Sequence, residues 1–331
     1  MKKRIALVLA CAVSLSLAGC GSGEGTPQGQ EKGEQASGSA KYQVGICQQV
    51  QHEALDAATQ GFKDALEEAL GGDVDFEEQN AQGDSNTCAT IINGFVSADK
   101  DLILANGTAA LQAAQAGTSE IPVLGTSVTE YGVALGIEDF SGVAGGNISG
   151  TSDLAPLDQQ AAIFRELLPE ANKVGLLYCS AEANSQYQVD VMKEELEQLG
   201  YQCEYYAFSD SNDLSAVATS AAGQCDAIYI PTDNTAASNA ELINNICQPE
   251  KVPVITGEKG PCAVCGIATL SIDYYDLGAA TGEMAAKVLT GEADISQMEI
   301  QYAPQFTKMY NPAICGELGI EVPGGYEPIE E

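Results

Sequence analysis

The sequence predicts an α/β protein with two similar Rossmann-like lobes, each built on a parallel sheet, around a ligand cleft. From Tyr42 onward, short apolar runs alternate with longer amphipathic stretches, which is the pattern of parallel strands joined by helices. The same pattern recurs in the second half of the chain. The length of 331 residues also exceeds one ordinary core and suits two domains of roughly 150 residues.

The recurrence is visible in the predicted strands and in the segments that connect them. In each half an apolar run is followed by an amphipathic segment, a second apolar run with a polar turn, and a third run that contains proline. The three matched pairs of strands are 44–47 with 174–177, 101–105 with 226–230, and 121–124 with 252–255.

Two of the connecting helices can be predicted from the spacing of their apolar residues. One covers 54–70 and the other covers 188–199, and in both the apolar side chains recur at helical spacing. Glycine follows the last turn of each, Gly71 in the first and Gly200 in the second, and glycine is the residue that most often ends a helix.

The N-terminus has the features of a secretion signal. Basic residues 2–4 precede the apolar run 5–18, which is shorter than the about 20 residues that a membrane-spanning helix needs. The run ends in Leu-Ala-Gly before Cys20, which resembles a bacterial lipobox. We therefore expect a signal peptide over 1–19, a lipid on Cys20 that anchors the protein outside the cytoplasm, and a flexible tether over 20–40. The alternative is an ordinary secretory signal with an incidental cysteine.

Charge and composition exclude several classes of function. Asp and Glu number 47 against 14 Lys and Arg, so the net charge of −33 argues against a partner that is a nucleic acid. A single histidine, His52, excludes a His-rich metal site. The sequence has no G-x-S-x-G, no Walker A and no G-x-G-x-x-G motif. We therefore expect neither an enzyme nor a cofactor.

Cysteines are frequent without forming a clear pattern. Nine remain beyond Cys11 and Cys20, and an odd number cannot all pair within one chain. The one C-x-x-C, at 262–265, precedes a strand-like run and has no second pair nearby, which a zinc site would need. A loop disulfide or free thiols is the preferred interpretation, and a redox or metal role is the alternative.

Small polar residues gather where predicted strands pass into helices, at 48–53, 106–108, 125–129, 180–185 and 232–235. In parallel sheets these turns lie at the ligand-binding edge. Hydroxyl groups and free backbone N–H groups there suit a carboxylate, and Asp233 with Glu182 suits an ammonium group, so together they would hold an amino acid. Each residue taken alone is also a common helix cap.

The candidate ligand-binding residues come mostly from these turns. Thr108 and its neighbours are expected to hold a ligand carboxylate, and Asp233 to face the ammonium group. His52 has two interpretations, a helix-cap or loop contact and a position facing the ligand. The complete predicted set is His52, Thr108, Ala109, Ser127, Asn184, Ser185, Asp233, Asn234, Thr235 and Tyr274.

Several motifs resemble one family, the substrate-binding lipoproteins of ABC transporters, in the branch linked with tryptophan and tyrosine uptake. The most specific are Glu-Ala-Asn-Ser at 182–185 and Pro-Thr-Asp-Asn-Thr at 231–235; the lipobox, Asn-Ile-Ser-Gly at 147–150 and Ile-Asp-Tyr-Tyr-Asp-Leu-Gly at 272–278 add to them. The resemblance implies a type I periplasmic-binding fold, an ABC permease and its ATPase as partners, and an aromatic amino acid as ligand. Another hydrophobic amino acid, a short peptide or a purine-like molecule is the alternative ligand, and a surface sensor or adhesin the alternative role.

The expected domain organisation follows from the repeat and the resemblance. The first lobe is expected over 41–148 plus 273–295, and the second over 149–272 plus part of 296–325. Crossing segments near 147–151 and 268–273 would form a hinge on which a monomer closes over its ligand.

Overall fold

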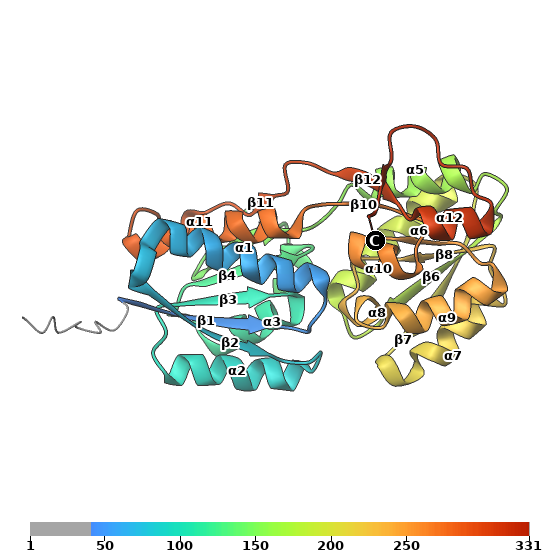
Figure 1. Ribbon diagram of the computed structural model, residues 1–331. Helices are drawn as coiled ribbons and strands as arrows, with labels where there is room; N and C mark the ends of the chain where they lie inside the picture. The colour runs from blue at the N-terminus through green and yellow to red at the C-terminus, as the bar shows by residue number, and fades with distance from the viewer. Residues whose placement is uncertain (1–40, 331) are drawn as a thin grey trace, which may run out of the picture. The chain divides into compact units, whose positions relative to one another are not determined.

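The computed structural model describes residues 41–330, so the predicted signal peptide, the tether and Cys20 lie outside the described residues. Two sheets, each of mostly parallel strands, run through these residues (Figure 1). The strand order is β11-β5-β4-β3-β1-β2 in the first sheet and β13-β12-β10-β9-β8-β6-β7 in the second. The predicted α/β class with two similar lobes is confirmed, since five consecutive strands of each lobe follow the same spatial order.

The first lobe alternates strands and helices as the sequence predicts. Its elements are β1 (Tyr42–Gln48), α1 (Glu53–Leu70), β2 (Val74–Asn80), α2 (Ser85–Ser97), β3 (Leu102–Asn106), α3 (Thr108–Gly117), β4 (Val123–Val128), α4 (Tyr131–Leu135) and β5 (Ile148–Ser152). Helix α1 ends at Gly71, whose φ of 61° is the left-handed conformation that glycine adopts without strain.

The second lobe repeats the pattern with additional short helices. Its elements are α5 (Leu157–Leu167), β6 (Lys173–Cys179), α6 (Ala183–Gln198), β7 (Gln202–Phe208), α7 (Ser211–Ala222), β8 (Ala227–Ile230), α8 (Asn234–Ala237), α9 (Ala240–Glu250), β9 (Val254–Thr256), α10 (Lys259–Cys265) and β10 (Ala268–Ser271). Helix α6 begins five residues before the predicted start at 188, because its first turn consists of polar residues that are equally typical of a loop.

The last part of the chain contributes to both sheets. Helix α11 (Tyr274–Thr290) and strand β11 (Gln301–Tyr302) belong to the first lobe, and β12 (Thr307–Tyr310), α12 (Pro312–Leu318) and β13 (Glu327–Pro328) belong to the second. Strand β12 runs antiparallel to β10. The chain therefore passes between the sheets three times, at 153–156, 272–273 and 303–306.

One expected boundary differs from the observed strands. The sequence pattern assigns 149–152 to the second lobe, whereas these residues form most of β5, which pairs with β4 in the first sheet. Gly150 permits this pairing, since a Cβ at that position would lie 2.0 Å from the carbonyl oxygen of Gly125. The first crossing consequently begins at Asp153.

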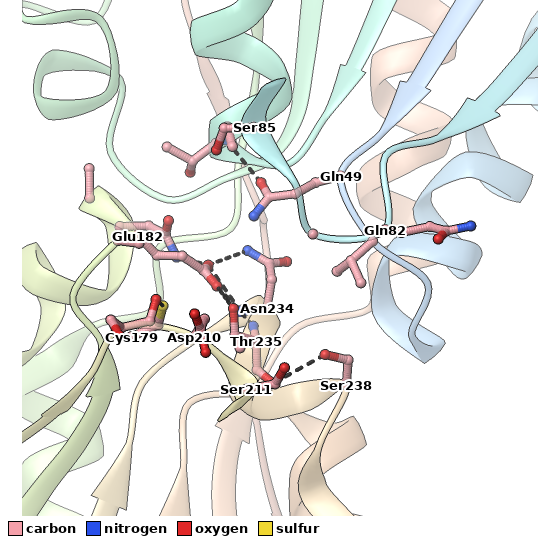
Figure 2. Close-up of a pocket in the computed structure, with 18 of the residues that line it drawn as sticks. Gln49, Gln82, Ser85, Cys179, Glu182, Asp210, Ser211, Asn234, Thr235 and Ser238 are labelled. Carbon is pink, nitrogen blue, oxygen red and sulfur yellow. Dashed lines mark hydrogen bonds between the residues drawn. The ribbon is translucent and has the colours of Figure 1, made fainter. Parts of the chain in front are cut away.

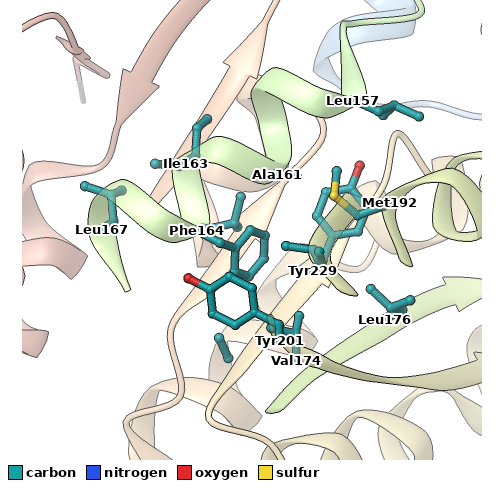
Figure 3. Close-up of a cluster of buried hydrophobic side chains, with 14 of the residues drawn as sticks. Leu157, Ala161, Ile163, Phe164, Leu167, Val174, Leu176, Met192, Tyr201 and Tyr229 are labelled. Carbon is teal, nitrogen blue, oxygen red and sulfur yellow. The ribbon is translucent and has the colours of Figure 1, made fainter. Parts of the chain in front are cut away.

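Both sheets are covered by helices on both faces, and the alternation of buried side chains along each strand accounts for this. In β1, Val44 and Ile46 pack under α1 and α11, whereas Cys47 faces α2 and α3. In the second lobe, α5 and α6 cover one face, where the Phe164 ring packs against Tyr201 and Tyr229 at centroid distances of 6.1 and 6.3 Å (Figure 3).

All nine cysteines among residues 41–330 are free thiols, and eight of them are buried. The C-x-x-C segment lies within α10 and both of its cysteines are free, so the free thiols are confirmed, whereas the loop disulfide is wrong. Its two thiols, Cys262 and Cys265, face the apolar interior, and burial raises the pKa of both. No helix within residues 41–330 has both the length and the apolar character needed to cross a membrane.

Helices α1 and α11 lie side by side on the first sheet (Figure 1). Their contact depends on two glycines. A Cβ at Gly278 would lie 2.0 Å from the Ala58 carbonyl oxygen, and one at Gly61 would lie 2.0 Å from that of Tyr275. These distances are too short for any side chain, so the two helix backbones touch directly.

We predict that Gly278→Ala destabilises the protein, because the added methyl group forces the two helices apart. Overpacking of this kind costs about 1–3 kcal/mol in the free energy of unfolding, which urea denaturation would measure. Gly94→Ala in α2 is the matched control: a Cβ there meets no atom within 4 Å, and alanine favours a helix by about 0.5–1 kcal/mol. Equal effects of the two substitutions would contradict the close contact.

Candidate functional site

Polar turns from both lobes line a cavity of about 220 Å³ at the carboxyl ends of the parallel strands (Figure 2). From the first lobe, Gln49 follows β1 and Thr108 begins α3 after β3. From the second lobe, Glu182 follows β6, and Asn234 begins α8 after β8. The repeat of the sequence therefore brings equivalent turns of the two lobes to one cavity.

Half of the predicted site residues line this cavity, namely Thr108, Ala109, Asn184, Asn234 and Thr235. His52 lies beside them and is bonded to Asn234. The other four, Ser127, Ser185, Asp233 and Tyr274, are buried and do not line the cavity.

His52 connects the two lobes. It is the N-cap residue of α1, yet its side chain makes no capping hydrogen bond. Instead, its Nε2 lies 3.1 Å from Oδ1 of Asn234 in α8. Burial lowers the pKa of the His52 imidazole. His52 is thus the N-cap residue of α1 without a side-chain cap, and its ring contacts Asn234, which lines the cavity.

Asp233, expected to face a ligand ammonium group, is instead held by the backbone of its own lobe. Its Oδ2 accepts a hydrogen bond of 2.6 Å from the amide of Cys179, and its Oδ1 accepts one of 2.8 Å from the amide of Ala236. Burial and repulsion by Glu182 raise the pKa of Asp233 to about 7. Its carboxylate thus ties the end of β6 to the start of α8.

Glu182 has a similar role at the wall of the cavity. Oε1 accepts hydrogen bonds from the amide and the hydroxyl of Thr235, at 2.8 and 2.7 Å. Oε2 accepts them from the amide and the side chain of Asn234, at 3.1 and 2.7 Å. Figure 2 shows Glu182 directed at these two residues. The carboxylate is therefore fully occupied in fixing the first turn of α8.

A second polar group, the acidic cluster of Asp153, Glu258 and Tyr274, lies buried where the chain crosses between the lobes. Asp153 directly follows β5, Glu258 directly precedes α10, and Tyr274 begins α11. The Tyr274 hydroxyl donates a hydrogen bond of 3.1 Å to Oδ2 of Asp153. Burial raises the pKa of Asp153 to about 6, and burial together with repulsion by Asp153 raises the pKa of Glu258 well above its ordinary value.

The set of site residues predicted from the sequence does not include Gln49, Asp153 or Glu258. Gln49 accepts a hydrogen bond of 2.9 Å from the amide of Ala109 and so fixes the start of α3. The sequence does contain a signal for the two acids, because each lies just after a buried strand. Asp153 directly follows β5, and Glu258 lies two residues after the end of β9. Within residues 41–330, no three side chains of His, Cys, Asp or Glu are arranged to hold a metal ion.

We predict that Glu182→Gln destabilises the protein by about 1–3 kcal/mol, since an amide nitrogen replaces one acceptor and leaves buried donors of Asn234 or Thr235 without a partner. Chemical unfolding would measure the loss. Glu194→Gln, on the exposed side of α6, removes the same charge and should have no measurable effect. Equal stability of both variants would show that Glu182 does not hold α8.

Comparison with known proteins identifies the family. A family model described as ABC transporter substrate binding protein matches residues 43–325. The tyrosine-binding protein of Clostridioides difficile is 35% identical over 296 residues, which cover 88% of this chain and 85% of that protein.

Two solved structures are similar over nearly as much of the chain. One, a domain from Streptococcus pneumoniae in complex with L-Trp, has 30% identity and a TM-score of 0.83, covering 88% of this chain and all of that one. The other, from Clostridium difficile, is the ligand-free, open structure of a substrate-binding protein with adhesive properties, with 36% identity and a TM-score of 0.67, covering 87% of this chain and 99% of that one. This chain therefore belongs to the substrate-binding proteins of ABC transporters, with the type I periplasmic-binding fold.

Proposed function

We propose that the protein is the extracytoplasmic binding lipoprotein of an ABC importer and that it captures an aromatic amino acid between its two lobes. The observation that carries the proposal is 35% identity, over 88% of the chain, to a protein that binds tyrosine. The similarity to a structure in complex with L-Trp supports the same class of ligand. Membership of the family supports delivery of the ligand to a permease and its ATPase.

The cavity supports a ligand of this kind, because it draws polar groups from both lobes. We assign the ligand carboxylate to the N-terminal turn of α3, at Thr108 beside Ala109, where the helix end carries partial positive charge. The Ala109 amide already donates to Gln49, so the contact falls to Thr108. Asn184, Asn234 and Thr235 would contact the ligand from the second lobe. A ligand that contacts both lobes stabilises their association.

Three crossings between the sheets support a hinge. We propose a first lobe of 41–152 with 273–302, and a second of 153–272 with 303–330, following the sheet in which each strand lies. The short crossings at 153–156 and 272–273 would absorb the change in backbone angles when a monomer closes.

An adhesin is the second candidate, favoured by 36% identity to a substrate-binding protein with adhesive properties. The two roles separate in a strain without this protein. Loss of uptake of labelled tyrosine or tryptophan with normal attachment to host surfaces supports the importer. Loss of attachment with normal uptake supports the adhesin.

We predict that isothermal titration calorimetry of the protein without its tether shows binding of L-tyrosine or L-tryptophan, with about one ligand per chain. Leucine, isoleucine, valine and a purine such as guanine form the comparison set and should bind at least about tenfold more weakly. The aliphatic side chains fill less space than an aromatic ring, and guanine has neither the carboxylate nor the ammonium group of an amino acid. Mass spectrometry of ligand released from the purified protein gives an independent answer. Heat from a member of the comparison set, with none from aromatic amino acids, would overturn this choice of ligand.

We predict that Cys20→Ser moves the protein from the membrane fraction to the soluble fraction or the medium, because the lipid that anchors it can no longer be attached. Cell fractionation and immunoblotting measure this, and Cys11→Ser, which alters the predicted signal peptide but not the lipobox cysteine, is the control. Retention of the Cys20→Ser protein at the membrane would contradict lipid anchoring.

A further inference from the structure

The acidic cluster combines groups from both lobes at the crossings. Asp153 opens the crossing from β5 to α5, and Tyr274 ends the crossing from β10 to α11. Glu258 comes from the second lobe, where it is the N-cap residue of α10 yet makes no capping hydrogen bond with its side chain. Capping the helix, the usual role of an acidic residue at a helix start, therefore does not explain the position of Glu258.

In the described part of the chain, three of the four oxygens of these two carboxyl groups lack a hydrogen-bond partner; the fourth, Oδ2 of Asp153, accepts from the Tyr274 hydroxyl. Asp153 is 4% exposed and Glu258 is 1% exposed. Within residues 41–330, Oδ1 of Asp153 and both oxygens of Glu258 accept no hydrogen bond, and no Lys, Arg or His side chain pairs with either residue. A buried carboxylate without donors or a cation is strongly destabilising, and such groups in native proteins mark a missing ion or ligand.

A chain of contacts links the cluster to the cavity. Asn184 lines the cavity, is 4% exposed, and donates a hydrogen bond of 2.9 Å from Nδ2 to the carbonyl oxygen of Thr232. The side chain of Thr232 lies near enough to the Tyr274 hydroxyl to oppose the rise in the pKa of Tyr274. Oδ1 of Asn184 has no partner among the described residues. A residue that lines the cavity therefore carries an unsatisfied acceptor.

We propose that Asp153 and Glu258 bind the ammonium group of the amino-acid ligand, with Oδ1 of Asn184 as a further acceptor along the ligand. An ammonium group offers a positive charge and three N–H donors, which the unpartnered oxygens require. This inference rests on the proposed function. It replaces Asp233 and Glu182 in that role, since both of those carboxylates already accept hydrogen bonds from their own lobe.

The surroundings of the pair predict how binding depends on pH. The titratable neighbours of the pair are acidic or neutral at neutral pH. Asp153 is faced by Tyr274, Tyr131 and Glu258, and Glu258 is faced by Asp153, Asp233, Glu182, Glu53 and Tyr274. Burial raises the pKa of Asp153 to about 6, and burial with repulsion by Asp153 raises that of Glu258 well above its ordinary value. As the pH falls below 6, Asp153 takes up a proton and attracts an ammonium group only weakly. Affinity for an amino acid should therefore fall as the pH drops from 7 to 5.

The test compares Asp153→Asn and Glu258→Gln with the wild-type protein by titration calorimetry at pH 8. The probes are L-tyrosine and L-tryptophan, each paired with its amino-free analogue, 3-(4-hydroxyphenyl)propionate or indole-3-propionate. Loss of a charge-assisted hydrogen bond should weaken amino-acid binding by about ten- to a hundredfold, while the analogues change by less than about twofold. Glu194→Gln, an equal loss of charge at an exposed position, should bind as the wild type does.

Thermal unfolding of the ligand-free variants separates binding from folding. Replacing an unpartnered buried carboxylate by an amide should leave the melting temperature unchanged or raise it, whereas loss of a purely structural group would lower it. The wild-type pH titration provides the same test without any substitution, should either variant fail to fold.

The possible outcomes distinguish this inference from the proposed function. Three results would overturn the ammonium site while leaving the proposed function intact. Both variants could bind the amino acids with wild-type affinity, or they could lose affinity for amino acids and analogues equally. The third is a wild-type affinity for amino acids that does not change between pH 7 and 5. Failure of the wild-type protein to bind either amino acid would overturn the proposed function and this inference with it.

Discussion

A carboxylate removed from water needs hydrogen-bond donors or a cation, and this constraint distinguishes the acidic side chains that lie where the two lobes meet. Asp233 and Glu182 satisfy it with amides and hydroxyls, and in doing so they fix the start of α8 against the end of β6. Glu258 does not satisfy it within the described chain, and Asp153 does so only at Oδ2, through the Tyr274 hydroxyl. Asp233 and Glu182 therefore stabilise the fold beside the cavity, whereas three buried carboxylate oxygens remain without a donor among the described residues.

The repeat explains why such groups accumulate at one place. Each lobe runs its strands in the same order, so the carboxyl ends of β1, β3 and β4 in one sheet correspond to those of β6, β8 and β9 in the other. Backbone groups at these ends have no further strand to pair with, and polar turns satisfy them. The same turns then present spare hydroxyl, amide and carboxylate groups to whatever lies between the lobes.

Strand and helix positions were predictable because they depend on local patterns. The apolar run at 44–47 lies within β1, and Gly71 and Gly200 end α1 and α6 with φ values of 61° and 93°. Less predictable was the sheet to which a strand belongs. Strand β5 joins the first lobe through close contact between Gly150 and Gly125, which no local pattern reveals. The C-x-x-C segment became a helix for a similar reason, since its thiols pack into the core.

The site was predictable only in part, because residue type does not reveal burial or partners. Thr108 and Asn234 were recognisable as polar residues at strand-to-helix turns. Asp233 appeared to be free for a ligand, yet the amides of Cys179 and Ala236 occupy it, and those partners depend on the packing of α8 against β6. Asp153 and Glu258 resembled ordinary turn residues, and only their unpartnered oxygens in the folded chain set them apart.

The most direct measurement is a crystal structure of the protein with L-tyrosine bound at pH 8. The account predicts that the ligand lies between the lobes, with its ammonium nitrogen within hydrogen-bond distance of Asp153 or Glu258 and its carboxylate at the start of α3. Density for the ammonium nitrogen at Asp233 or Glu182, or for the ligand outside the region between the lobes, would contradict it.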